Sequence, residues 1–416
     1  MDSPKCILIL TADAGFGHRS AANAVAAAMA EKYGDSVQIE IVNPLDDERT
    51  PFFIRDSQSD YDIILHHAPE LYKFGYDVSD GVISSVIVES ALTVLLFEVM
   101  RDIIRKYQQA VILTTYPLYH APLQAYSTLT DNCVPILTTV TDLVTVHKLW
   151  FNSHVTACCV PTEEVYNLAL SNNISPEKVF ITGIPVHPQI VQEKRTKEEI
   201  RQELGWQTGL PTFLAVGSRR VDRLLETLNV LNHFGAPVQL AAVAGKDEKL
   251  FAQLKEIEWH IPVHLYEFVD NMPDLMHASD VLISKAGGLI VTEAMAAGLP
   301  MILVDILPGQ EEGNAEYVVN NNAGDLALDP TIMLEITAHW LQNNCNLLTE
   351  RAAAARSAGK PDAAYQVAEK LWLAANGEPL VAEETLASNR TSLIDLLNQH
   401  KVKWQENLFL PGKKQS

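Results

Sequence analysis

Short apolar runs recur along most of the 416-residue chain, and polar or alanine-rich stretches separate them. Such runs suit parallel strands that are covered on both faces. We expect strands at 7–10, 37–42, 110–115, 134–141, 156–160 and 179–185 in the first half, and at 212–216, 238–243, 261–265, 281–283 and 301–304 in the second. Helices are expected between them, for example at 20–32, and again at 333–375. This alternation predicts right-handed crossovers and parallel sheets.

One charged stretch, 189–205, interrupts the rhythm of strands and suits a hinge region. The pattern therefore predicts an α/β protein with two similar units, at 1–187 and 188–376. A tail at 377–416 is polar and then apolar, and we expect it either to pack back on the body or to remain mobile. The cleft between the two units is the default place for a ligand.

The most apolar window, 81–100, is long enough to cross a membrane. Glu89, Glu98 and three serines lie within it, and these residues disfavour a span. A buried or interfacial helix is therefore the preferred interpretation. The segment 71–100 is where we expect a lipid-facing surface, although a helix in the protein core fits the same pattern.

Charge and composition narrow the function classes. The formal net charge of −21 disfavours nucleic acid, because phosphates repel an acidic protein. The run Ile7–Leu10 is too short for a signal peptide. The five cysteines are odd in number and match no metal-ligand spacing, so we interpret them as reduced thiols. These features together predict a cytoplasmic protein.

A glycine turn in the second half carries the clearest chemistry. The apolar run 281–283 leads to Gly287 and Gly288, and Gly298 ends the helix that follows. A helix start has unpaired N–H groups and partial positive charge, so it can hold a phosphate. Glu293, about one turn into the helix, is close enough to contact an attached ribose. An ordinary strand–helix–strand unit is the alternative interpretation.

A second glycine turn lies near the N-terminus, at 11–19. It does not match the dinucleotide-binding fingerprint, because the third glycine is missing. His18 stands at the start of the next helix, where the helix dipole lowers the pKa of an imidazole and keeps it neutral. A neutral imidazole is the form that a general base needs. His18 can also simply cap the loop or bind the acceptor.

The segment 281–314 resembles the donor-sugar site of family 28 glycosyltransferases. The matching residues are Lys285, Gly287, Gly288, 292–294 (Thr-Glu-Ala), Gly298, Pro300 and 308–311 (Pro-Gly-Gln-Glu). Segments at 11–19, 138–151, 161–165 and 179–188 further resemble monogalactosyldiacylglycerol synthases and the related bacterial diacylglycerol glucosyltransferases. These segments include Gly-Phe-Gly-His-Arg at 15–19 and Val-Thr-Asp at 140–142.

The resemblance implies a GT-B fold, in which two Rossmann-like domains face each other. It further implies an inverting transfer of glucose or galactose from a UDP-sugar to diacylglycerol, without a metal or another cofactor. The N-terminal domain would receive the lipid at the membrane surface and the C-terminal domain would hold the UDP-sugar. The protein would then be cytoplasmic and peripherally bound to the membrane.

The resemblance also assigns roles by position. His18 would act as the base or position the acceptor, and Asp142 is a weaker candidate for either role. Glu293 would bind the ribose. The other implied substrate contacts are Gly15, Gly17, Gly217, Arg219, Phe268, Val269, Lys285, Gly287, Gly288, Thr292, Gln310, Glu311 and Asn314.

Departures from the family pattern keep other functions open. Arg219 and Arg220 stand in a loop that is usually rich in glycine, His187 stands where relatives often carry arginine, and Gly288-Leu289 replaces a Pro-Gly pair. A transfer to a soluble acceptor, an epimerase of UDP-amino sugars and a non-catalytic nucleotide-sugar binder are the alternatives.

Overall fold

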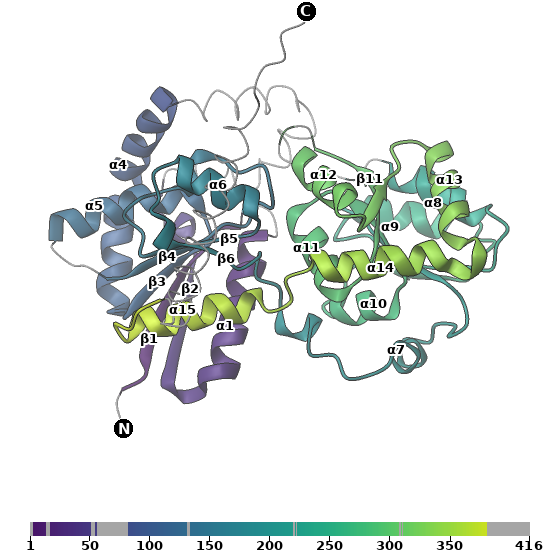
Figure 1. Ribbon diagram of the computed structural model, residues 1–416, viewed down its shortest axis with the longest axis horizontal. Coiled ribbons are helices and arrows are strands. Elements are labelled where there is room, and N and C mark those ends of the chain that lie inside the picture. Colours follow the sequence, from purple (N-terminus) through teal and green to yellow (C-terminus); the bar gives the residue numbers. More distant parts are fainter. Residues whose placement is uncertain are drawn as a thin grey trace, which may run out of the picture.

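The computed structural model describes residues 3–13, 17–50, 55, 82–130, 134–218, 221, 223–307, 309 and 311–380. These residues form two six-stranded parallel sheets with helices on their faces, set side by side (Figure 1). The α/β class predicted from the apolar runs is confirmed.

The first sheet has the strand order β2-β1-β3-β4-β5-β6. Its strands are β1 (Lys5–Leu10), β2 (Val37–Val42), β3 (Val111–Thr114), β4 (Ile136–Thr139), β5 (Ala157–Val160) and β6 (Val179–Ile181). Its helices are α1 (Gly17–Tyr33), α4 (Val82–Tyr107), α5 (His120–Thr130) and α6 (Glu163–Ser171).

Both faces of the first sheet are buried, which explains the uninterrupted apolar runs of its strands. On β1, Leu8 and Leu10 pack with residues of α4 and α5, such as Leu96. Ile7 and Ile9 point to the other face and pack with α1. All four β1 side chains are fully buried.

The second sheet has the strand order β12-β11-β10-β7-β8-β9. Its strands are β7 (Thr212–Val216), β8 (Gln239–Val243), β9 (Val263–Tyr266), β10 (Val281–Lys285), β11 (Met301–Asp305) and β12 (Gly324–Leu326). Its helices are α7 (Lys197–Glu203), α8 (Leu224–Asn232), α9 (Glu248–Glu256), α10 (Met272–Ala278), α11 (Gly288–Ala297), α12 (Glu312–Asn320), α13 (Pro330–Leu341) and α14 (Asn346–Ala358). Short 3₁₀ helices lie at Gly34–Ser36, Pro44–Asp46, Pro117–Tyr119, Lys148–Trp150, Pro176–Lys178, Pro188–Ile190 and Asn343–Cys345.

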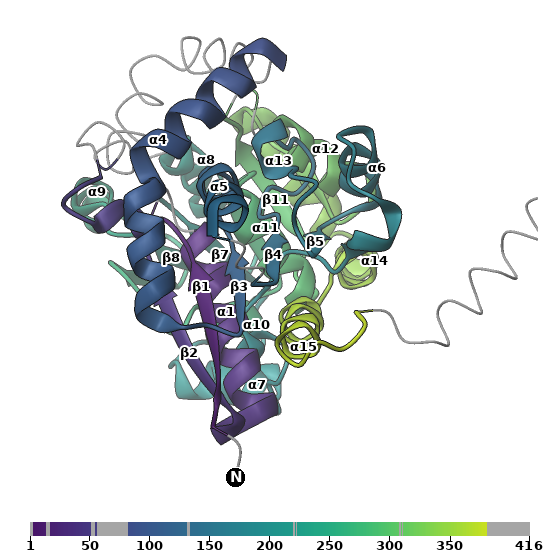
Figure 2. The same ribbon diagram turned by 90° about the vertical axis from the view of Figure 1, so that its left-hand side faces the viewer.

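The last described helix, α15 (Ala363–Ala375), returns to the first sheet, where it lies beside α1 (Figures 1 and 2). Val367 and Leu371 are fully buried in the same core as Ile7 and Ile9. The boundaries predicted at 187/188 and 376/377 stay a prediction, but α15, which that division assigns to the C-terminal unit, packs on the N-terminal one. The chain therefore crosses between the two units twice.

Helix α4 covers the apolar window that suggested a membrane span. Leu96 and Met100 are fully buried in the core that also contains Leu8 and Leu10, whereas Val94 is 79% exposed. Among the described residues, no helix is long and apolar enough to cross a membrane. Most of the segment predicted to face lipid, residues 71–81 and the side chains of 82–89, falls outside the described part of the chain, so that prediction is untested.

Candidate active site

Each sheet contains a switch point, where the chain changes from adding strands on one side of a central strand to adding them on its other side. In the first sheet β1 lies between β2 and β3, and in the second sheet β7 lies between β8 and β10. Ligands of open α/β sheets bind at the carboxyl ends of the strands at such points. The helices that follow β1 and β10 begin with His18 and Gly288 in their first turns, and these are the two most informative residues of the sequence.

His18 lies in the first turn of α1, and its ring is held by the ends of two strands. Its Nδ1 is 2.9 Å from the carbonyl oxygen of Thr115, after β3, and 2.8 Å from Oγ1 of Thr141, after β4. A carbonyl oxygen only accepts hydrogen bonds, so Nδ1 carries the hydrogen of the neutral ring. Nε2 therefore keeps its lone pair, which makes it available as a base.

The surroundings of His18 favour its neutral form. Burial lowers the pKa of His18 below its ordinary value, and the opposing effect of the Asp142 carboxylate does not cancel this. The start of α1 disfavours the imidazolium further. Tyr116 and Trp150 lie beside the ring, at 4.9 and 6.0 Å between centroids. The Trp150 indole donates to Asp142 Oδ2 at 2.7 Å, so Asp142 is oriented as well.

Helix α11 begins in the way that the glycine turn predicts. Gly287 is the N-cap, so no side chain caps the amides of the first turn. A Cβ atom built on Gly288 would lie 3.5 Å from the Thr141 carbonyl oxygen and 3.9 Å from the Leu143 nitrogen. The start of α11 therefore faces the loop that holds His18. Thr292 uses its hydroxyl within the helix, where it donates to the Gly288 carbonyl at 2.7 Å.

Glu293 is the least satisfied polar group of this helix. It is partly buried and makes no hydrogen bond or ion pair with any described residue. Burial raises the pKa of its carboxyl to about 7. An uncompensated carboxyl is costly to ionise, so its position suits a ligand that brings hydroxyl donors.

Three more of the predicted contacts lie at the end of β10 and at the start of α12. Lys285 and Glu311 form a largely buried ion pair, and Glu311 Oε2 also accepts from the Leu307 amide at 3.1 Å. Asn314 donates to the Ala286 carbonyl at 2.9 Å, while its own side-chain oxygen is buried without a partner among the described residues. The Asn314 oxygen and the Glu293 carboxyl are therefore the two groups here for which a bound ligand could supply the missing hydrogen-bond donors.

Other predicted contacts lie elsewhere on the same edge or serve packing. Phe268, after β9, is 47% exposed. Val269 is half-buried against the hydrophobic core that contains residues of α10 and α11. The Gly217 amide donates to the Val243 carbonyl at 2.8 Å, and a Cβ atom there would lie 2.5 Å from Leu250. Gly217 therefore serves backbone packing in this structure.

Gly17 opens α1, whereas Gly15, Arg219 and Gln310 fall outside the described residues.

Comparisons with known proteins decide the family. Residues 18–186 match the monogalactosyldiacylglycerol (MGDG) synthase model, and residues 213–367 match the glycosyltransferase family 28 C-terminal domain. The chloroplastic MGDG synthase of Spinacia oleracea is 34% identical over 89% of this chain and 72% of its own length. MGDG synthase 1 of Arabidopsis thaliana is 32% identical over 88% and 70%. The chain belongs to the MGDG synthase family.

Solved structures agree on the fold. MurG from Acinetobacter baumannii superposes with a TM-score of 0.57 at 15% identity, covering 89% of this chain and 99% of that one. The UDP complex of MnaA from S. aureus gives 0.58 at 13% identity, covering 91% and 98%. The predicted GT-B architecture is thereby confirmed.

The plant relatives are named as chloroplastic. For this chain, a cytoplasmic protein bound at the membrane surface stays a prediction.

Sequence reasoning missed that two threonines of this MGDG synthase family member hold the His18 ring. Thr115 is 97 positions from His18 in the chain, and Thr141 is 123 positions away. The available signal was their place: each is the last residue of a predicted strand, and the carboxyl ends of parallel strands share one edge. Threonine is common in buried strands, so residue type alone did not distinguish them.

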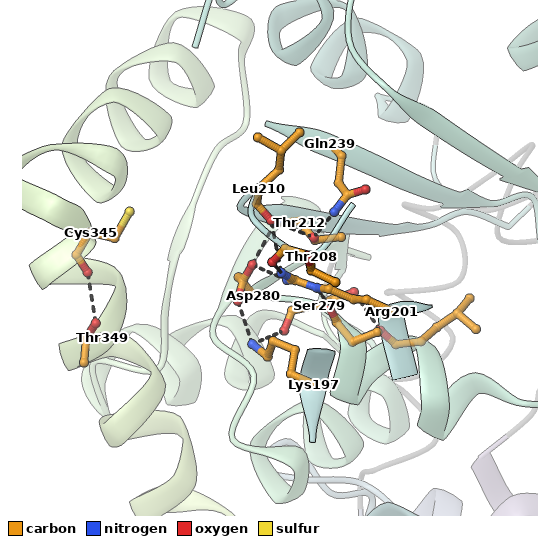
Figure 3. Close-up of polar contacts among 12 residues, drawn as sticks. Lys197, Arg201, Thr208, Leu210, Thr212, Gln239, Ser279, Asp280, Cys345 and Thr349 are labelled. Atoms are coloured by element: carbon orange, nitrogen blue, oxygen red, sulfur yellow. Dashed lines mark hydrogen bonds and ion pairs between the residues drawn. The ribbon is translucent and has the colours of Figure 1, made fainter. Parts of the chain in front are cut away.

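A cavity of about 660 Å³ lies at the opposite edge of the second sheet, beside the segments that precede β7, β10 and β11, and Figure 3 shows polar residues from its lining. Its polar groups largely bind one another. Arg201 and Lys197 both donate to Asp280 at 2.6 Å, and Asp280 also accepts from the Thr212 amide at 2.8 Å. We interpret this network as the support that fixes where these strands begin.

Proposed function

We propose that this MGDG synthase family member transfers a hexose from a UDP-sugar to the free hydroxyl of 1,2-diacylglycerol, with galactose as the preferred sugar and with inversion. One juxtaposition carries the proposal: Thr141 holds His18 through its hydroxyl and approaches Gly288 with its carbonyl. A candidate base and a candidate diphosphate cradle thus lie on two sides of one residue. The names of the two MGDG synthases described above support galactose and diacylglycerol.

The reaction follows from this geometry. The acceptor hydroxyl would donate to Nε2 of His18, which takes the proton as the oxygen attacks the anomeric carbon. The leaving group is UDP, whose diphosphate gains charge as the glycosidic bond breaks. The uncapped amides of Gly288 and Leu289 would stabilise that charge, together with the positive end of the α11 dipole.

The remaining contacts would position the donor. Glu293 would accept hydrogen bonds from the ribose, and the Asn314 oxygen would accept one from a sugar hydroxyl. Glu311 is already paired with Lys285, so this pair would present both charges to the sugar at a fixed place. We expect the transfer to proceed without a metal or another cofactor, as the family resemblance implies.

The test is turnover with dispersed diacylglycerol and either UDP-galactose or UDP-glucose, followed by mass analysis and assignment of the anomeric proton coupling of the product. We expect a β-linked galactosyl lipid as the main product. UDP-sugar consumption that does not depend on lipid would instead favour a soluble acceptor or an epimerase. UDP binding without any turnover would favour a non-catalytic binder.

A further inference from the structure

An unusual backbone turn follows β8, at the same edge of the second sheet as the start of α11. Gly245 and Lys246 are both left-handed, with φ of +68° and +67°. A Cβ atom on Gly245 would lie 2.3 Å from the Gly217 carbonyl oxygen, so this position requires glycine. Nothing comparable requires lysine at 246, where glycine or asparagine would adopt the same backbone with less strain.

The turn is fixed on both sides, which explains why Lys246 cannot relax. The Ala244 amide donates to the Tyr266 carbonyl at 2.8 Å, and the Lys246 amide donates to the Glu267 carbonyl at 3.3 Å. Asp247 then caps α9 by accepting from the Leu250 amide at 3.0 Å. Strained residues that the surrounding structure holds in place gather at ligand sites.

The side chain of Lys246 is exposed and directed at an aromatic ring. Its Nζ lies 4.4 Å from the ring centroid of Phe268, which is itself 47% exposed. The ammonium makes no hydrogen bond or ion pair with a described residue, so its donors are available. The exposed Phe268 ring offers a stacking face to a flat, polar ligand, and the ammonium that lies over this ring can swing to the edge of the ligand and donate a hydrogen bond.

The order of strands places this pair at the far end of the proposed donor. From the start of α11, after β10, the edge passes the ends of β7 and β8 before it reaches β9 and Phe268. Three strand spacings amount to about 14 Å. A nucleoside that extends along this edge from a diphosphate at α11 would reach Lys246 and Phe268, while α11 already provides the positive charge for the phosphates.

We propose that Lys246 is a specificity-determining residue that reads the 4-position of the nucleobase in the donor, an inference that rests on the proposed function. Uracil has a carbonyl oxygen at this position, which accepts a hydrogen bond from the ammonium. Cytosine has an amino group there, which can only donate, and the ammonium has no lone pair to accept it. Phe268 stacks on either pyrimidine without distinguishing them.

The test is calorimetric binding of UDP and CDP to the full-length protein and to the Lys246→Met variant, which keeps the side-chain stem. We expect wild type to bind UDP at least tenfold more tightly than CDP. We expect Lys246→Met to lose about tenfold in UDP affinity and nothing in CDP affinity. Lys246→Arg should keep most of the preference, and Phe268→Leu should weaken both nucleotides alike.

The remaining outcomes overturn the inference. Equal losses of UDP and CDP affinity in Lys246→Met would mean that the lysine contacts the diphosphate or stabilises the fold. No loss would mean that it does not contact the nucleotide. A wild type that binds both nucleotides equally also contradicts the inference, while leaving the proposed transfer intact. A wild type that binds neither nucleotide overturns the proposed function together with it. Lys246→Gly separates strain from recognition, because it should melt at a higher temperature and still lose the UDP preference.

Discussion

The two switch points differ in how their principal titratable side chains, His18 and Glu293, are held. In the first sheet His18 is held by Thr115 and Thr141, and Asp142 is held by Trp150. In the second sheet Glu293 has no partner among the described residues. Under the proposed function, the first site is organised before any substrate arrives, whereas the second would be completed by its ligand. A base must be aimed in advance, while a binding carboxyl gains affinity from partners that the ligand supplies.

Removal of the base should have the largest effect. We expect His18→Ala to lower kcat by about 10²- to 10⁴-fold, because general-base catalysis contributes that much. UDP affinity should stay within twofold of wild type, since His18 belongs to the other switch point. Steady-state kinetics and calorimetry measure the two quantities. A variant that retains kcat would remove His18 from the chemistry.

Thr141→Val provides a matched control for His18. It removes the hydroxyl 2.8 Å from Nδ1 and leaves the Thr115 contact and the imidazole in place. We expect a smaller fall in kcat, about tenfold, because the ring keeps one of its two anchors. A fall as large as that of His18→Ala would mean that Thr141 itself contacts the reacting groups.

The unpaired carboxyl of Glu293 should show opposite effects on binding and on stability. We expect Glu293→Gln to weaken UDP binding by about 10- to 100-fold, because a charged acceptor for the ribose is lost. The same variant should stabilise the ligand-free protein by about 3 kcal/mol at pH 8, since the pKa is raised from 4.5 to about 7. Denaturant titration at pH 8 measures this gain.

The pH dependence of that stability has a definite sign. A carboxyl whose pKa is raised in the folded state stabilises fully below its unfolded pKa, and this contribution is lost as pH rises through about 7. Wild type should therefore lose stability relative to Glu293→Gln between pH 4.5 and pH 7, and the difference should level off above that. Parallel slopes for the two proteins would mean that the Glu293 pKa is ordinary.

Donor affinity should follow the same titration in the opposite direction. Ribose hydroxyls donate stronger hydrogen bonds to an ionised carboxylate than to the neutral acid, so UDP affinity should rise by up to about tenfold between pH 6 and pH 8. UDP's own phosphate also ionises in this range, so Glu293→Gln provides the baseline. The part of the rise that the variant lacks belongs to Glu293, and identical profiles would contradict the assignment.

The smallest effect concerns the contact between the two units. A Cβ atom on Gly313, in α12, would lie 2.5 Å from Thr145 Oγ1 and 3.1 Å from Val144. Gly313→Ala should therefore push the second site away from His18 and lower kcat by a few-fold, with UDP affinity unchanged. Adding Thr145→Ala removes the closest contact and should restore part of the rate. An unaffected kcat would show that catalysis does not need this approach of the units.

The parts of the fold that the sequence could predict are those with a local pattern of residues. Runs such as 37–42 and 212–216 were placed to the residue, because strands buried on both faces have an unmistakable pattern. The turn at Gly287 and Gly288 was found because a helix start after a strand has local signals. Strand β12 was missed because it is only three residues long and contains Asp325. The packing of α15 on α1 was missed because its apolar face fits either unit.

Long-range contacts account for the rest of the site. The partners of His18 come from the ends of two other strands, and no local pattern joins positions 18, 115 and 141. Gly217 is a substrate contact only by the family resemblance, and no local pattern showed that the Leu250 side chain fills the space beside it. The left-handed backbone of Lys246 is likewise imposed by neighbouring strands. Such features depend on packing between segments, which the order of residue types does not encode locally.

The central claim is that the start of α11 holds a diphosphate directly opposite His18. The structure of the full-length protein with UDP bound tests it most directly. We predict that the β-phosphate accepts from the amides of Gly288 and Leu289, with the ribose hydroxyls on Glu293 and the open face of the phosphate turned towards the His18 ring. A nucleotide bound away from Gly288, or with its ribose out of reach of Glu293, would contradict the account.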